Sequence, residues 1–145
     1  MSRPVIWWVR RDMRLTDNEA LCAALEAGPV IPLFIYETRS ESLGAAPRWR
    51  LKRALEAFSE ALSEKGSKLV LRRGAALDVL RDVIAESGAT QVHWGRLYDP
   101  ASRRIDSDIK KTLRADGVQA HSHIGHILHE PMSVKTQTGD FYKVF

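Results

Sequence analysis

A five-residue apolar run near the start of the chain, Val5–Val9, ends abruptly in a cluster of charged residues. The run is rich in β-branched and aromatic side chains, which predicts a strand buried on both faces of a parallel sheet. The charges that follow it are Arg10, Arg11, Asp12 and Arg14. Open α/β sheets bind ligands beyond the carboxyl ends of their strands, so these charges lie where a ligand crevice is expected. Thr16 and Glu19 then have the spacing of a capping box, which predicts the start of a helix.

Four further apolar runs alternate with four segments of helical periodicity. The predicted strands are 5–9, 32–36, 68–72, 91–94 and 118–121, and the predicted helices are 17–27, 47–65, 77–86 and 100–116. This alternation predicts an α/β fold with a five-stranded parallel sheet that is covered on both faces. A doubly wound, Rossmann-like sheet of order 3-2-1-4-5 is the natural topology.

Turn-forming residues set the expected ends of these elements. Gly28, followed by proline, is expected to end the first helix with a positive φ. Pro47 is expected at the first position of the second helix, and Asp99 is expected to cap the fourth. Pro32 cannot donate to a ladder, which favours a place on an edge or at the start of its strand. The residues expected to face inward from the second and fourth helices are Leu51, Leu55, Phe58, Leu62, Ile105, Ile109 and Leu113.

The composition fits one soluble globular domain. The chain has 145 residues, of which 44% are hydrophobic, enough to bury a core at that size. The net charge of +4 permits a contribution to nucleic-acid binding without demanding one. The single cysteine, Cys22, allows no internal disulfide, which favours a reducing compartment for the protein. We expect its side chain to be a small core residue on the apolar side of the first helix. The first apolar run is too short for a signal peptide or a membrane span, so we expect a cytoplasmic protein without a membrane partner.

The last part of the chain, from Ile124, loses this periodicity and ends on the aromatic segment 141–145. An apolar terminus has nothing in the predicted domain to pack against. We therefore expect a fragment of a longer protein, with a domain over residues 1–123 and the start of a linker over 124–145.

Several motifs occur in the order found in DNA photolyases and cryptochromes. The segment Trp8–Asn18 is similar to the opening W-F-R-x-D-L-R-x-x-D-N of that family, with Val9 and Met13 as apolar departures. The segment Val92–Pro100 resembles its turn V-x-W-N-R-x-Y-E-P. Three further matching segments are 44–51, 128–131 and 139–145. The resemblance covers essentially the whole chain.

This resemblance implies the N-terminal antenna domain of a larger protein whose helical C-terminal domain, with FAD, is missing. The parent would be a deoxyribodipyrimidine photolyase that uses blue light to split cyclobutane pyrimidine dimers in damaged DNA. The antenna domain of such a protein can carry a deazaflavin, FMN or a folate. Two alternatives are the same domain of a cryptochrome photoreceptor and a stand-alone binding module.

Ten residues at the ends of the predicted strands are candidates for binding this chromophore. They are Arg10, Arg11, Asp12, Tyr36, Glu37, Arg48, Trp49, Arg96, Tyr98 and Asp99. Arginine forks can bond and stack on a flat heterocycle, and an aromatic platform beside polar groups suits a ring ligand. The structural alternatives are an Arg–Asp network that braces the first loop, core packing by Trp49, surface packing by Tyr98 and helix capping by Asp99.

Other residues favour structural interpretations. One branch of the family anchors a folate with an Asn-Glu pair, and the aligned positions here are Ala101 and Ser102, which argues against that binding mode. The tryptophans Trp7, Trp8 and Trp94 are expected in the core rather than in electron transfer. The histidines of the tail are His121, His123, His126 and His129, and without cysteine or a fixing helix they do not predict a zinc site.

Generic nucleotide chemistry and hydrolytic catalysis are both disfavoured. The loop 9–16 contains no glycine, which excludes a dehydrogenase fingerprint. There is no nucleophile–base signature, so no catalytic residue is assigned to this chain.

Overall fold

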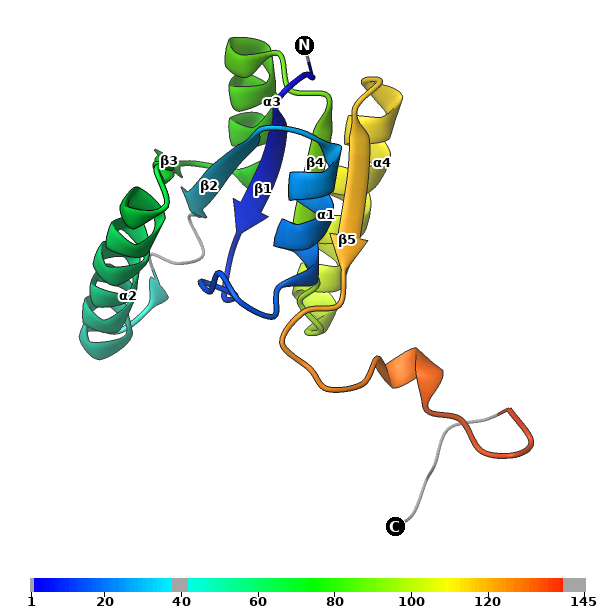
Figure 1. Cartoon of the computed structure of the whole chain (residues 1–145). Helices are drawn as coiled ribbons and strands as arrows, with labels where there is room; N and C mark the ends of the chain where they lie inside the picture. The colour runs from blue at the N-terminus through cyan, green and yellow to red at the C-terminus, as the bar shows by residue number, and fades with distance from the viewer. Residues whose placement is uncertain (1, 38–41, 140–145) are drawn as a thin grey trace.

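The computed structural model describes residues 2–37 and 42–139. Its elements in chain order are β1 Val5–Val9, α1 Glu19–Ala27, β2 Val30–Tyr36, α2 Ala45–Glu64, β3 Val70–Arg73, α3 Ala76–Ser87, β4 Gln91–Gly95, α4 Pro100–Ala115, β5 Gln119–His123 and the 3-10 helix η2 Pro131–Ser133 (Figure 1). All strand pairs are parallel, and the strand order is β3-β2-β1-β4-β5. The predicted α/β class and the predicted order are both confirmed.

The strand β1 lies at the centre of the sheet and is buried along its whole length. It pairs with β2 on one side, where Trp7 lies opposite Pro32, and with β4 on the other, where Trp8 lies opposite Trp94. A strand with two neighbouring strands and helices over both faces has no solvent side, which explains why its sequence is apolar without alternation.

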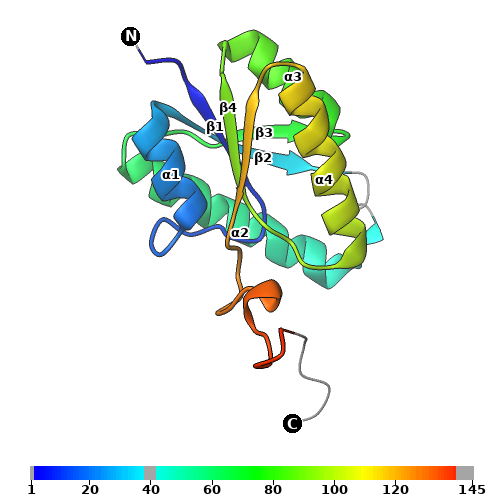
Figure 2. The same cartoon turned by 90° about the vertical axis from the view of Figure 1, so that its right-hand side faces the viewer.

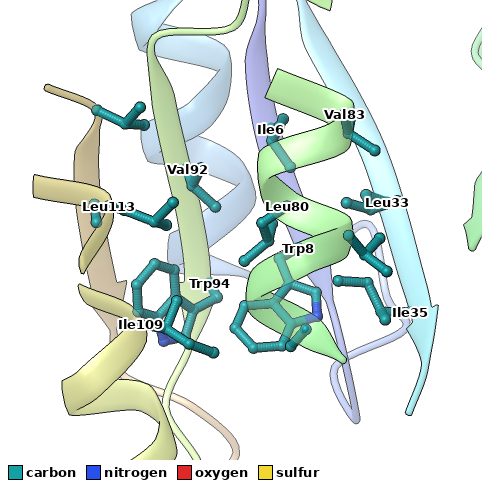
Figure 3. Packing of buried hydrophobic residues seen from close by; sticks show 14 of the residues in the cluster. Ile6, Trp8, Leu33, Ile35, Leu80, Val83, Val92, Trp94, Ile109 and Leu113 are labelled. Carbon is teal, nitrogen blue, oxygen red and sulfur yellow. The ribbon is translucent and has the colours of Figure 1, made fainter. Parts of the chain in front are cut away.

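Two helices cover each face of the sheet, with α3 and α4 on one face and α1 and α2 on the other (Figures 1 and 2). Alternate residues of β1 point to opposite faces, so Trp8 joins one hydrophobic cluster and Trp7 the other. Figure 3 shows the first cluster, in which Leu80 of α3 and Ile109 of α4 pack over the tryptophans of β1 and β4. All three strand tryptophans are buried, so their predicted place in the core is confirmed.

The structure tolerates Pro32 inside the sheet rather than at an edge. Its strand begins at Val30, two residues earlier than predicted, and lies between β1 and β3. The pairing with β3 starts only at Leu33, so the neighbour does not reach the proline. Pro32 has no N–H to donate, but no described residue of β3 lies opposite it and loses a hydrogen bond on that side.

The first helix is capped by Asn18, and the predicted cap at Thr16 is wrong. The Asn18 side chain accepts a hydrogen bond from the backbone N–H of Leu21 at 3.1 Å, and the helix begins at Glu19. Its Nδ2 atom also donates to the carbonyls of Asp12 and Arg14. The amide of asparagine caps through its oxygen and has two N–H hydrogens for the two carbonyls, whereas a threonine hydroxyl has only one hydrogen to donate.

Two turn residues differ from their predicted roles. The helix α2 begins at Ala45 with Gly44 before it, so Pro47 occupies its third position rather than its first. The first-turn N–H groups have no intrahelical partner, and a proline is tolerated there for that reason. Gly28 has an extended φ of 161°, and a side chain there would place Cβ 2.7 Å from the carbonyl oxygen of Arg3. The close approach of two backbone segments requires this glycine, rather than a positive φ.

Two residues predicted to face inward lie at the surface. Cys22 of α1 is exposed, because the buried side of that helix is formed by Ala20, Leu21 and Ala24. Ile105 of α4 is 38% exposed, since the buried side of α4 follows a different spacing.

The chain after β5 runs away from the sheet, and its described part contains only turns and η2 (Figures 1 and 2). The aromatic end of the chain, 141–145, lies outside the described residues. The domain boundary at residue 123 stays a prediction. None of the described helices is long and apolar enough to cross a bilayer.

We expect Leu113→Ala to lower the free energy of unfolding by about 2 to 5 kcal/mol, because Leu113 is fully buried and truncation leaves a cavity. Ile105→Ala on the same helix serves as the control and should cost less than half as much. Urea unfolding followed by circular dichroism measures both. Equal losses of stability in the two variants would contradict the observed orientation of α4, in which Leu113 is buried and Ile105 is exposed.

Candidate ligand-binding cleft

A cleft of about 520 Å³ lies where β1, β2 and β4 end. Its lining residues are Trp8, Val9, Arg10, Arg11, Met13, Phe34, Ile35, Glu37, Leu43, Leu51, Leu97, Asp99, Ala101 and Ser102. This is the position at which an open α/β sheet of this strand order binds its ligand, beside the point where the order reverses.

Most of the lining is apolar, and the polar groups come from three loops. The strands contribute Trp8, Phe34 and Ile35, while Arg11, Glu37 and Asp99 supply charge. A hollow of this size, with apolar walls and a few charges, suits a flat organic ring that carries polar substituents.

Arg10 is buried and forms a two-pronged ion pair with Asp106 of α4. Its Nη1 donates to Oδ1 at 2.8 Å, and its Nη2 donates to Oδ2 at 2.7 Å and to the carbonyl of Gly95 at 2.6 Å. Its guanidinium carbon lies 4.5 Å from the ring centre of Trp8, at cation–π distance. The guanidinium is therefore held against the wall of the cleft, as in the structural alternative of an Arg–Asp network.

Asp106 was not predicted from the sequence as the partner of Arg10, although the sequence contains a signal for it. The buried residues of α4 are Ser102, Asp106, Ile109 and Leu113, at spacings of four, three and four. Extending the apolar stripe of this helix backwards places Asp106 and Ser102 on its inner side. A carboxylate on an inner helix face requires a partner, and Arg10 is the buried cation that supplies it.

Asp12 stabilises the loop between β1 and α1 rather than facing the cleft. Its Oδ1 accepts from the backbone N–H of Arg10 at 3.1 Å, and its Oδ2 accepts from Asn18 at 3.3 Å. The carboxylate of Asp12 also packs closely against Gly95, where a side chain would place its Cβ 3.1 Å from Oδ2 of Asp12.

Asp99 caps α4, as predicted, and still lines the cleft. Its carboxylate accepts from the backbone N–H of Ser102 at 2.9 Å. Hydrogen bonds from Ser102 lower the pKa of Asp99, and the nearby charge of Arg11 lowers it further. Arg11 is exposed and lines the cleft, whereas the charge of Arg10 is paired with Asp106.

The remaining candidates lie outside the cleft. Tyr36 and Arg48 line a second hollow, of about 690 Å³, between α2 and β3. Trp49 is 64% exposed, and the guanidinium of Arg53 lies 5.6 Å from its ring centre. The structure thus brings together Arg10, Arg11, Glu37 and Asp99 of the ten candidates, and their roles in binding stay predictions.

Arg96 and Tyr98 contact the segment that leads into η2. Both donate to Glu130, from Arg96 Nη1 at 2.6 Å and from the Tyr98 hydroxyl at 2.9 Å. The hydroxyl of Tyr98 in turn accepts from the backbone N–H of Gly125. Burial raises the pKa of Tyr98, and the Glu130 charge adds to the shift, whereas Gly125 opposes it.

Three histidines stack across β4 and β5 on the face that carries α1. His93 lies 4.9 Å from His121 and 5.2 Å from His123, measured between ring centres. His93 also contacts the Oε1 atom of Gln91 through Nε2, and the Nε2 atom of His123 through Nδ1. An amide oxygen only accepts, so Nε2 of His93 carries its proton. Within the described chain, no three His, Cys, Asp or Glu residues are placed to hold a metal ion.

Burial lowers the pKa of His93 to about 4, and the neighbouring His121 and His123 add to this effect. The pKa values of His121 and His123 are also lowered, first by burial, although Glu19 opposes the shift at His123. These rings are therefore neutral in the fold at neutral pH.

The family described as DNA photolyase matches residues 5–145 of the chain. A deoxyribodipyrimidine photo-lyase of Agrobacterium fabrum is 46% identical over 99% of this chain, which spans 30% of that protein. Cryptochrome-1 of Arabidopsis thaliana is 37% identical over 97% of the chain, which spans 21% of it.

Solved structures show the same likeness. The crystal structure of a bacterial class III photolyase from Agrobacterium tumefaciens matches with a TM-score of 0.91 and 44% identity, over 99% of this chain and 30% of that one. An archaeal photolyase from Sulfolobus tokodaii, solved with two FAD molecules and described as implying a novel light-harvesting cofactor, matches with a TM-score of 0.76 and 27% identity, over 88% of this chain and 31% of that one. The chain thus spans less than a third of the length of these relatives.

We expect Asp106→Ala to lower the free energy of unfolding by about 3 to 5 kcal/mol, because it leaves the buried guanidinium of Arg10 without a counter-charge. Asp108→Ala, an exposed carboxylate on the same helix, should change stability by less than about 0.5 kcal/mol. Denaturant unfolding of both variants checks this. Similar stability of the two variants would show that the pair contributes nothing to holding the cleft.

We expect the chain to lose stability as pH falls from about 6.5 towards 4. In that range the unfolded chain protonates His93 while the fold resists protonation, so protons favour unfolding. The loss should be absent above neutrality, where the ring is neutral in both states. Thermal unfolding at pH 7.5 and pH 5 measures the slope for the wild type and for His93→Gln, which should lose less on acidification. An unchanged slope in the variant would assign the acid sensitivity elsewhere.

Proposed function

Since the chain belongs to the DNA photolyase family, we propose that it is the light-harvesting domain of a photolyase and binds an antenna chromophore in its cleft. The observation that carries the proposal is the cleft of about 520 Å³ at the ends of β1, β2 and β4. Its position, its size and its apolar walls suit a planar ring system.

The residues of the cleft fit such a group. Apolar side chains from two strands offer a surface for a flat ring, and Arg11, Glu37 and Asp99 offer charges for its substituents. Arg10 also lines the cleft, and its buried Nε has no hydrogen-bond partner within the described chain. A buried unpaired donor is costly, and an acceptor on a ligand would relieve that cost.

The candidate chromophores are a deazaflavin, FMN and a folate. Ala101 and Ser102 line the cleft at the positions where an Asn-Glu pair would anchor a folate in one branch of the family. An alanine offers no hydrogen bond, and Ser102 is buried with its backbone N–H bonded to Asp99. This favours a deazaflavin, FMN or a folate held in another orientation.

When bound, the chromophore absorbs light and transfers the excitation to a flavin. The residues of this chain fix where the chromophore sits and how it is oriented, which sets the efficiency of such a transfer. The ion pair between Arg10 and Asp106 keeps one wall from moving, and the apolar strand residues exclude water from the ring.

The parent is proposed to be a deoxyribodipyrimidine photolyase, in which FAD bound by a C-terminal domain drives the splitting of pyrimidine dimers in damaged DNA. The chain by itself is expected not to repair DNA. The 37% identity to a cryptochrome supports a second candidate, a photoreceptor with the same antenna domain. Blue-light reversal of thymine dimers by the parent, with its FAD reduced, separates the two.

We expect the purified chain, mixed with FMN, a deazaflavin or a folate, to bind one of them and to show its near-ultraviolet or visible absorption after gel filtration. Mass spectrometry of the released compound identifies it. Ala101→Phe should weaken binding at least about tenfold, because the larger side chain fills the cleft. Ala115→Phe, an exposed position at the other end of α4, is the control.

A protein spectrum without bound chromophore for all three compounds would contradict binding by this chain alone. Equal binding by Ala101→Phe and Ala115→Phe would place the chromophore outside this cleft.

A further inference from the structure

A third hollow, of about 430 Å³, lies on the other side of the Arg10–Asp106 pair. It is bounded by α4, by the ends of β4 and β5, and by the segment that leads into η2. We call it the anion pocket and define it by Trp94, Arg96, Arg103, Lys110, Ser122 and Glu130. None of these residues lines the candidate chromophore cleft.

Lys110 is a half-buried cation in this pocket without a counter-charge. Its Nζ donates to the Ser122 hydroxyl at 2.9 Å, and no carboxylate within the described chain pairs with it. Burial lowers the pKa of Lys110, and the charges of Arg114 and Arg96 lower it further, while Asp106 raises it. An anion bound beside the ammonium would offset both the burial and the repulsion.

The carboxylates that border the pocket are already engaged with other cations. Asp106 is bonded to Arg10, and Glu130 is bonded to Arg96 at 2.6 Å. The exposed Arg103 has no ion pair within the described residues. Lys110 and Arg103 therefore give the pocket an excess of positive charge that the fold does not balance.

Trp94 adds a neutral donor to these cations. The residue is fully buried, yet it borders the pocket, and its Nε1 has no hydrogen-bond partner in the part of the chain that is described. Figure 3 shows the indole nitrogen on the side of the ring nearest Ile109 of α4, the neighbour of Lys110. An indole N–H can only donate, so it requires an acceptor atom.

We propose that the anion pocket binds a small molecule that carries a phosphate or carboxylate group, at a site separate from the chromophore cleft. The anionic group contacts the ammonium of Lys110 and the guanidinium of Arg103, and an oxygen of the ligand accepts from the Trp94 indole. Glu130 and Arg96 close the side of the pocket opposite α4. The proposal does not depend on chromophore binding, because Leu97 is the one described lining residue that the two hollows have in common, and none of the residues that define the anion pocket lines the cleft.

The test follows the indole ¹H–¹⁵N resonance of Trp94 in the full chain during titration with inorganic phosphate and, separately, with citrate. Sodium chloride at matched ionic strength controls for screening. We expect a saturable shift with at least one of the two anions and none with chloride. Lys110→Met should weaken binding at least about tenfold, because it removes a charge-assisted contact.

Lys111→Met removes an exposed charge from the same helix and should leave the affinity unchanged. Arg103→Gln, at an exposed position, is the second variant and should also weaken binding. Saturation by phosphate alone would identify a phosphate ester as the ligand class, and saturation by citrate alone a carboxylate. Failure of both anions to saturate, or equal losses in Lys110→Met and Lys111→Met, would overturn the proposal.

Discussion

The buried ion pair between Arg10 and Asp106 joins the end of the central strand to α4, and the carbonyl of Gly95 joins β4 to the same guanidinium. Removing two charges from water is costly, and only good geometry with further hydrogen bonds offsets that cost. The two contacts with Asp106 supply the geometry, and the Gly95 carbonyl accepts the further hydrogen bond. The ring of Trp8 adds a cation–π contact. The pair also separates two hollows, because Arg10 borders the chromophore cleft and Asp106 borders the anion pocket.

The polar loop after β1 depends on the same arrangement. Asp12 accepts from the backbone of Arg10, and Asn18 bonds to Asp12 while it caps α1. A change in the position of Arg10 would therefore alter both the cleft wall and the start of the first helix. The sheet below is held differently, by apolar packing of tryptophans on its two faces. Stability of the sheet and precision of the site thus rest on separate interactions.

The fold was predictable because it depends on patterns that are repeated along the chain. Apolar runs, helical stripes and glycine or proline breaks fix the elements and their alternation, and parallel β-α-β connections leave few topologies. Single-residue roles were less predictable. Thr16 and Asn18 are both good caps, and only the tertiary contacts of Asn18 with Asp12 and Arg14 decide between them. Cys22 is exposed because small alanines, not its own polarity, set which side of α1 meets the sheet.

The candidate site was predictable in position but only partly in membership, for a reason that lies in strand geometry. Adjacent residues of a strand point to opposite faces. At the end of β2, Tyr36 therefore borders the hollow near α2 while Glu37 borders the cleft. After β4, the chain turns so that Arg96 and Tyr98 face the tail while Asp99 faces the cleft. A motif read from sequence selects all of these residues together, whereas the fold divides them between hollows. Residues of one motif thus border different hollows on the two sides of a single buried ion pair.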